Sequence, residues 1–75
     1  MHLLVVEDES RMAALLQKGL SEEGYTVSVA ADGFAGLEAG RSAEVDLILL
    51  DVMLPGMDGF ALAKRLRADG VTTPI

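Results

Sequence analysis

The sequence contains no cysteine and no tryptophan, and aromatic residues make up only 4% of its 75 positions. Without cysteine the chain can form no disulfide and no thiolate metal site, which fits the reducing cytoplasm, and we expect a cytoplasmic location. A core of this size supplies only about 3–5 kcal/mol without a disulfide or a metal to staple it. Stability must therefore come from dense packing of apolar side chains.

Long hydrophobic runs and excess positive charge are also missing. No apolar run approaches the ~20 residues that span a bilayer, and the opening Met-His-Leu-Leu lacks the basic leader and cleavage site of a signal peptide. We therefore expect no membrane contact. Lys and Arg number 6 against 12 Asp and Glu, a net charge of −6. Because nucleic-acid binders usually present a basic face, we expect no nucleic-acid contact by this segment.

Hydrophobic residues make up 51% of the chain, which is typical of a packed α/β core. Residues 3–6 and 47–50 are apolar at every position, and this pattern predicts strands covered on both faces of a parallel sheet. Residues 25–29 alternate between apolar and polar side chains. This segment is predicted to be a less evenly covered strand near an edge of the sheet.

The first predicted helix lies between the first two of these strands. Ser10 is a candidate N-cap, Met12, Leu16 and Leu20 recur every fourth residue, and Gly24 follows as a stop. The spacing predicts one apolar helix face.

Two further helices are predicted. One begins at Asp32 and is short and weak, because three glycines lower its propensity. The other begins at Asp58, carries an apolar stripe and stops at Gly70. Residues 71–75 look like the approach to a fourth strand. The alternating order predicts an α/β fold with parallel strands joined by right-handed crossovers.

Acidic residues follow the two fully apolar strands. Glu7 and Asp8 come directly after the first, and Asp51 comes directly after the other. Ligands of open parallel sheets bind outside the carboxyl ends of the strands, so three carboxylates would converge there if the strands are neighbours. Such a cluster is costly unless a cation or proton lies within it. The plainer alternative is that these acids form only solvated turns or helix caps.

The ligand chemistry of this cluster favours a hard cation. Oxygen ligands without nearby His or Cys suit Mg²⁺ or Mn²⁺ better than zinc. An aspartate can also act as the nucleophile in phosphoryl transfer and form an aspartyl-phosphate.

Two segments, LLVVEDE at residues 3–9 and DLILLDVMLPGMDG at residues 46–59, resemble the receiver domain of bacterial response regulators. The resemblance extends over the whole chain in the correct order. It implies a flavodoxin-like, doubly wound parallel sheet. Residues 1–75 would then be a partial receiver domain, with the fourth and fifth strands and the last helices absent.

The resemblance also implies roles for individual residues. Asp51 would be the phospho-acceptor that takes phosphate from a sensor histidine kinase. Asp8, Asp51 and the backbone carbonyl of Met53 would bind Mg²⁺ (or Mn²⁺), and Glu7 would hold the metal through water. Residues 54–59, which include Pro55, would form the turn that shapes the site. Their plainer interpretation is a Pro-Gly turn followed by an Asp N-cap.

The amino-acid sequence of the segment most closely resembles the transcription-factor branch of this family, so the resemblance implies a parent protein with a winged-helix DNA-binding domain. Receivers of this family carry a Ser or Thr after the fourth strand and a Lys after the fifth. Thr72 and Thr73 precede the expected fourth strand, and Lys18 and Lys64 fall on predicted helices. We therefore expect the 75-residue piece to be signalling-incompetent by itself.

Three alternatives accompany this prediction. The piece could be a structural or engineered half-domain that self-associates through the exposed edge of its third strand, residues 47–50. An aspartate-nucleophile phosphatase of the haloacid-dehalogenase type needs an acidic residue two positions after the nucleophile, where this chain has Met53. No Gly-x-Gly-x-x-Gly follows the first strand, which disfavours dinucleotide binding. We therefore expect no enzyme activity.

Overall fold

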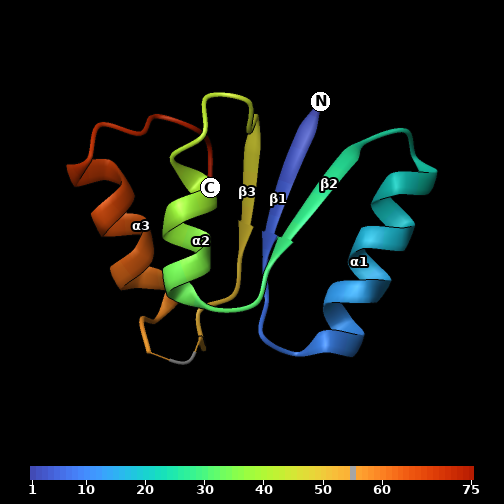
Figure 1. Cartoon of the computed structure of the whole chain (residues 1–75), viewed down its shortest axis with the longest axis horizontal. Coiled ribbons are helices and arrows are strands. Elements are labelled where there is room, and N and C mark those ends of the chain that lie inside the picture. Colours follow the sequence, from blue (N-terminus) through green and yellow to red (C-terminus); the bar gives the residue numbers. More distant parts are fainter. Residues whose placement is uncertain (55) are drawn as a thin grey trace.

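The computed structural model describes residues 1–54 and 56–75. Pro55, which the sequence places in a turn, lies outside the described residues. Strands and helices alternate along the chain, as the sequence predicts (Figure 1). In order they are β1 (His2–Val6), α1 (Ser10–Glu22), β2 (Thr26–Ala30), α2 (Gly33–Gly40), β3 (Leu47–Leu50) and α3 (Gly59–Ala68).

The three strands form a parallel sheet in the order β2-β1-β3. Leu4 of β1 is in register with Ser28 on one side and Ile48 on the other. The fully apolar strands β1 and β3 are therefore neighbours, and β2 lies at an edge, as its alternating sequence predicts.

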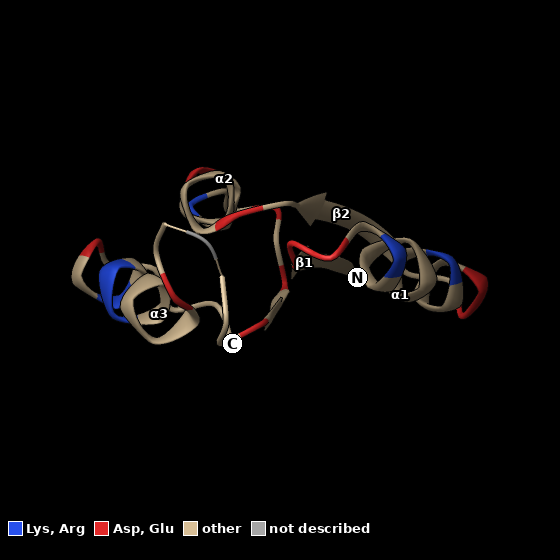
Figure 2. Cartoon of the chain, turned by 90° about the horizontal axis from the view of Figure 1, so that it is seen from below, with Lys and Arg blue, Asp and Glu red and all other residues tan. Residues whose placement is uncertain are grey.

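Helices cover both faces of this sheet. Leu4, Val6 and Ile48 pack with residues of α2 and α3 in one core cluster. Alternate residues of a strand point to opposite faces, so Val5 and Leu49 face α1, where they share a hollow with Leu16. Figures 1 and 2 show α1 beside β2, while α2 and α3 lie together toward β3. This is the doubly wound arrangement expected from the sequence.

Helix α2 is short and lies unusually close to its neighbours. Its side toward the core carries glycines, and Gly36 is buried. A Cβ at Gly36 would lie 2.8 Å from Val6 Cγ1 and 3.0 Å from Leu62 Cδ2. The glycines that weaken the helix thus allow its backbone to pack directly on β1 and α3.

The start of α1 differs from the prediction. Glu9, not Ser10, is the N-cap, and its carboxylate accepts hydrogen bonds from the N–H groups of Arg11 (3.2 Å) and Met12 (2.7 Å). The predicted apolar face is also displaced, because Ala13 is buried while Met12 is 46% exposed. Asp32 and Asp58 are the N-caps of α2 and α3.

The last five residues run beside the outer edge of β3 without forming a regular strand. The N–H of Ile48 donates to the carbonyl of Pro74 at 2.9 Å. Arg67 Nη1 donates to the carbonyls of Val71 and Thr73, both at 2.8 Å. Residues 71–75, predicted to be the approach to a fourth strand, thus lie beside β3. None of the helices in the described ranges has the length and apolarity needed to span a bilayer.

Candidate metal and phosphoacceptor site

Three carboxylates meet at the carboxyl edge of the sheet. Oxygen atoms of Glu7, Asp8 and Asp51 all lie within 4.8 Å of one another. Figure 2, which looks onto this edge, shows acidic positions on the loops that leave the strands. The structure thus brings together the three acidic side chains that the sequence places at neighbouring strand ends.

Backbone hydrogen bonds continue one residue beyond β1 and β3, and they fix the backbone positions of Glu7 and Asp51. The N–H of Asp51 donates to the carbonyl of Val6 at 3.1 Å, and the N–H of Glu7 donates to the carbonyl of Ala30 at 3.0 Å. Glu7 and Asp51 are therefore attached to the rigid sheet by their own amides. The sequence predicts this geometry because both strands are apolar up to the residue before the acid.

Local hydrogen bonds orient two of the three carboxylates. Asp51 Oδ1 accepts from the N–H of Met53 at 3.1 Å, and Glu7 Oε2 accepts from the N–H of Glu9 at 3.1 Å. Each bond uses one oxygen of its carboxylate, so the second oxygen is available to another ligand. Asp8 is exposed, whereas Glu7 and Asp51 are partly buried.

The electrostatics of the cluster favour an added positive charge. The N–H of Glu9 lowers the pKa of the Glu7 carboxyl, but desolvation and the carboxylates of Asp51 and Asp8 together raise it above its usual value. In the described part of the chain, both ion pairs involve Asp69, so neither neutralises the cluster. Three oxygen donors without a basic partner fit Mg²⁺ or Mn²⁺, which prefer hard oxygen ligands.

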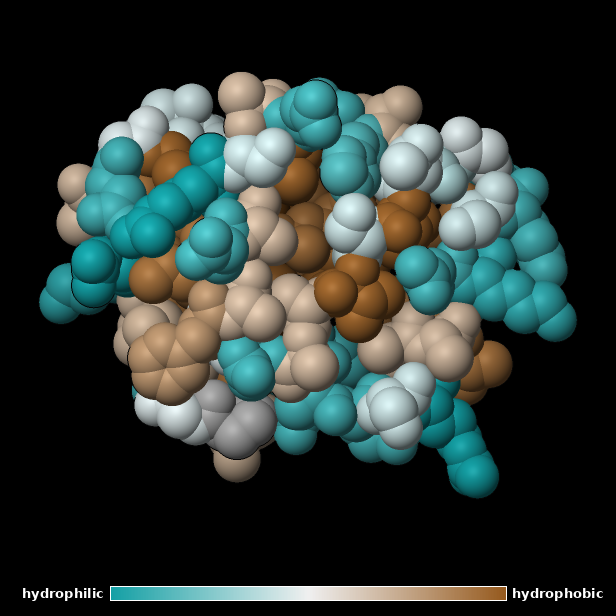
Figure 3. All heavy atoms as spheres, in the orientation of Figure 1, coloured by the Kyte–Doolittle hydropathy of each residue, from teal (hydrophilic) through white to brown (hydrophobic). Residues whose placement is uncertain are grey.

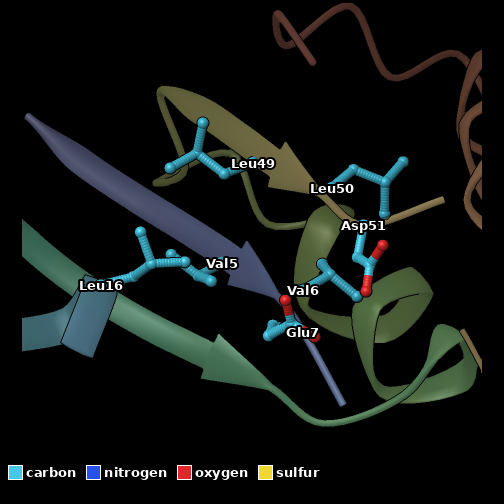
Figure 4. A pocket seen from close by; sticks show the side chains of 7 residues that line it. All are labelled: Val5, Val6, Glu7, Leu16, Leu49, Leu50 and Asp51. Carbon is cyan, nitrogen blue, oxygen red and sulfur yellow. The ribbon is translucent and has the colours of Figure 1, made fainter. Parts of the chain in front are cut away.

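A hollow of about 320 Å³ extends from this edge over the α1 face of the sheet. Figure 4 shows Glu7 and Asp51 just beyond the ends of β1 and β3, with apolar side chains along the strands behind them. Val5, Leu16 and Leu49 belong to this apolar lining. The groups of the hollow that can bind a cation therefore lie at the end formed by Glu7 and Asp51.

The loop after Asp51 is held against the start of α3. The N–H of Gly59 donates to the carbonyl of Val52 at 2.9 Å, and a Cβ at Gly59 would lie 2.8 Å from Val52 Cα. Leu54 is buried in the core, while the side chain of Met53 is 81% exposed. Backbone groups of this loop, and not the Met53 side chain, are therefore suited to face the acidic cluster.

The first turn of α2 also contacts this loop. A Cβ at Gly56 would lie 2.7 Å from Phe34 Cε2, and a Cβ at Gly33 would overlap the backbone oxygen of Met57. Phe34 did not stand out in the sequence as a site residue, because its partner is 22 positions away in the chain. The sequence feature that could have pointed to Phe34 is that it is a lone aromatic residue in a glycine-rich helix.

The fold and the acidic edge together define a class of protein. A parallel α/β sheet with helices on both faces and acidic side chains at its carboxyl edge is typical of flavodoxin-like domains. The sequence model of the response regulator receiver domain matches residues 3–75. The chain belongs to this family.

Individual relatives agree with this assignment. The chain is 51% identical over 73 residues to the transcriptional regulatory protein TcrA of Mycobacterium tuberculosis, covering 97% of this chain and 29% of TcrA. It superposes on the receiver domain of the Francisella response regulator 1452 with a TM-score of 0.92 and 33% identity, covering 97% of this chain and 60% of that one.

A further similar structure is the response regulator TrrA of Thermotoga maritima, solved in complex with Mg²⁺-BeF. Its TM-score is 0.85 with 37% identity, covering 91% of this chain and 59% of TrrA. The chain thus spans less than two thirds of the length of each of these relatives.

Proposed function

We propose that the chain is the phospho-accepting part of a response regulator and that Asp51 takes its phosphoryl group from a sensor histidine kinase. The observation that carries the proposal is the meeting of Glu7, Asp8 and Asp51 within 4.8 Å at the carboxyl edge of the sheet. An aspartate at such an edge is attached to a rigid strand and open to a donor. Membership of the receiver family supports the same role.

The metal ligands of this proposal are Asp8, Asp51 and the backbone carbonyl of Met53, with Glu7 acting through water. Mg²⁺ or Mn²⁺ bound there would neutralise negative charge on the phosphoryl group. The donor set supports the proposal because every ligand is an oxygen, and because desolvation together with the nearby carboxylates of Asp51 and Asp8 raises the pKa of Glu7. The similar structure of TrrA holds Mg²⁺-BeF.

The proposed reaction is a transfer between two side chains. A carboxylate oxygen of Asp51 attacks phosphorus, an O–P bond forms, and the P–N bond to the kinase histidine breaks. The histidine nitrogen keeps the electron pair of that bond. Asp51 would bind the metal through one carboxylate oxygen and attack with the other, and the Met53 N–H, which donates to Oδ1, orients the carboxylate.

A metal titration tests the proposal. Mg²⁺ should shift the amide resonances of Asp8, Asp51 and Met53, and beryllofluoride, a phosphate mimic, should shift them further in the presence of the metal. Asp51→Asn should remove the beryllofluoride response because the mimic needs a carboxylate oxygen. Unchanged amides in the wild type at millimolar Mg²⁺ would exclude a formed site in this chain.

The proposal includes the parent protein and its surroundings. We propose a cytoplasmic, DNA-binding transcription regulator whose receiver is a signalling module and not an enzyme, in line with the similarity to the transcriptional regulatory protein TcrA. Lys18 lies in α1 and Lys64 in α3, so neither follows a strand of this sheet. For this reason we propose that the 75-residue chain alone does not complete the signalling switch.

A second property concerns the outer edge of β3. The N–H of Ile48 is paired there with Pro74, and alternation along a strand points the N–H of Leu50 the same way. The edge borders a groove of about 380 Å³ whose lining includes Leu49, Phe60 and Ile75. We propose that a second copy of the 75-residue chain pairs with this edge, because apolar strand edges recruit other strands.

Light scattering after size-exclusion chromatography tests the self-association. The mass of the eluting species should rise above the 7.9 kDa of one chain as the protein concentration increases. A monomer at every concentration would contradict it, with no effect on the proposed phospho-acceptor.

A further inference from the structure

The loop that follows Asp51 contacts the first turn of α2 as well as the start of α3. The ring of Phe34 lies against Gly56, where a Cβ would come within 2.7 Å of Cε2 and 3.4 Å of Cδ2. Gly56 has φ +81°, a conformation that glycine adopts without strain. The aromatic ring thus occupies the space that any side chain at position 56 would need.

A second contact from the same turn reinforces the first. Gly33 is buried against Met57, and a Cβ there would lie 2.7 Å from Met57 Cβ and would overlap the Met57 carbonyl oxygen. Asp32 fixes the turn itself, since its Oδ1 accepts from the N–H of Ala35 at 2.8 Å. A capped, rigid helix end therefore contacts two consecutive described residues of the loop.

The exposure of Phe34 is unusual for a residue that only fills the core. Its side chain is 63% exposed, so burial of the ring contributes little to the hydrophobic core. What the ring does contact is the loop whose beginning carries Asp51 and Met53. Gly56 lies three positions after Met53 in the same loop, so a contact that restrains Gly56 restricts where Met53 can lie.

We propose that Phe34 is a positioning residue for the metal site: by resting on Gly56 it holds the backbone of Met53 beside Asp51. The inference rests on the proposed function, because Met53 matters only if its carbonyl binds a cation. Phe34 contacts no ligand atom and acts through the loop. Mutating a residue that orients a metal ligand from outside typically lowers metal affinity about 10- to 100-fold.

The test compares Phe34→Ala with Leu15→Ala. Leu15 lies on α1 and is 61% exposed, so the two variants remove apolar side chains of similar exposure from different helices. Phe34→Ala should raise the Mg²⁺ dissociation constant by about tenfold, the lower end of that range, because Phe34 acts through the loop, and Leu15→Ala should leave it unchanged. Phe34→Tyr keeps the ring and should restore wild-type affinity.

Hydrogen exchange provides the readout that does not need metal. In metal-free Phe34→Ala the amides of Met53 and Gly59 should exchange faster, while amides of β1 keep their protection and report an intact fold. Equal Mg²⁺ affinity and equal loop exchange in both alanine variants would overturn the proposal. If the wild type itself ignores Mg²⁺, the proposed metal site fails, and the Met53 exchange rate alone then decides whether Phe34 holds the loop.

Discussion

Glu7, Asp8 and Glu9 are adjacent in the sequence, yet their carboxylates have two different surroundings. Glu9 turns back to cap α1 and spends both oxygens on the N–H groups of Arg11 and Met12. Glu7 and Asp8 point toward Asp51 instead. The capping bonds thus remove one carboxylate from the acidic cluster, which limits the negative charge that a bound cation must offset.

Replacing Asp51 tests how strained the cluster is. In metal-free protein, Asp51→Asn should raise the free energy of unfolding by about 1 kcal/mol, because it removes one like charge from a partly buried group of three. The amide oxygen can still accept the Met53 N–H. Urea unfolding with EDTA present measures the change, and Glu38→Gln on the exposed side of α2 is the matched control. An Asp51→Asn variant no more stable than wild type would mean that solvent already screens the cluster.

Residues whose partners are close in the sequence could be predicted, and those with distant partners could not. Asp58 was predicted as an N-cap because the cap and the amide it accepts from are three residues apart. The prediction that Ser10 is the N-cap of α1 was wrong, because the longer side chain of Glu9 reaches two amides at once. The contact of Phe34 with Gly56 depends on how α2 packs, which no local pattern specifies.

At the scale of elements, α2 shows how a weak helix can be a well-packed one. Each of its three core-facing glycines lies against different neighbours. Gly33 lies against Met57, Gly36 against Val6 and Leu62, and Gly40 against Leu66 and Ile48. Propensity argues against a helix here, whereas close backbone approach requires small residues. Tertiary packing therefore outweighs propensity in this segment.

A pair of glycine-to-alanine changes separates these two effects. Gly36→Ala should destabilise the protein by about 1 kcal/mol, because overpacking against the stiff Val6 side chain exceeds the gain in helix propensity. Gly19→Ala should stabilise it by about 0.5–1 kcal/mol, because Gly19 lies within α1 with nothing within 4 Å of a new Cβ. Thermal and urea unfolding of both variants measure the difference. Stabilisation by both changes would show that propensity alone governs both helices.

The C-terminal ends of α2 and α3 are joined by an ion pair. Arg41 Nη2 lies 2.6 Å from Asp69 Oδ2, and Arg65 Nε lies 3.4 Å from the same oxygen. The hydrogen bond from Arg41 is the main cause that lowers the pKa of Asp69, and the charges of Arg41 and Arg65 add to it. The pair therefore stabilises the folded state only while Asp69 is ionised.

The stabilisation that the Arg41–Asp69 ion pair provides should be lost at acidic pH. A carboxyl with a lowered folded-state pKa stabilises the protein fully above its unfolded-state pKa and loses that effect as pH falls through the folded-state pKa. Asp69→Asn should thus be less stable than wild type at pH 7, and the gap should close toward pH values below the usual range of aspartate. Urea unfolding across this pH range tests it, and a gap that does not change with pH would assign the effect to packing.

At the scale of the whole molecule, the sequence predicted the sheet well because its strands are so uniform. Residues 47–50 are apolar throughout and form β3 with those same bounds, but only one face of the strand is well covered, because Ile48 is buried while Leu49 on the α1 face is 36% exposed. The edge position of β2 followed from its alternation in the same way. Met12 was misplaced because three apolar residues at a spacing of four drift around the helix, so one of them leaves the buried face.

The shape of the whole molecule leaves apolar surface in contact with water. Large side chains such as Met12, Phe34, Phe60 and Ile75 are exposed. Figure 3 shows apolar side chains across the middle of one face, with hydrophilic ones around them. Each copy also carries a net charge of −6, which opposes association at low salt.

Salt should therefore promote the proposed pairing of two copies. Raising NaCl from about 20 mM to about 500 mM shortens the range of the repulsion severalfold while leaving apolar contacts intact, so the dimer fraction at fixed protein concentration should increase. Phe60→Glu places a charge in the groove beside β3 and should abolish association at both salt concentrations. Leu15→Glu adds the same charge at a similarly exposed position on α1 and should not abolish it. If both glutamate variants dissociate equally, net charge alone controls association and the β3 edge is not the contact.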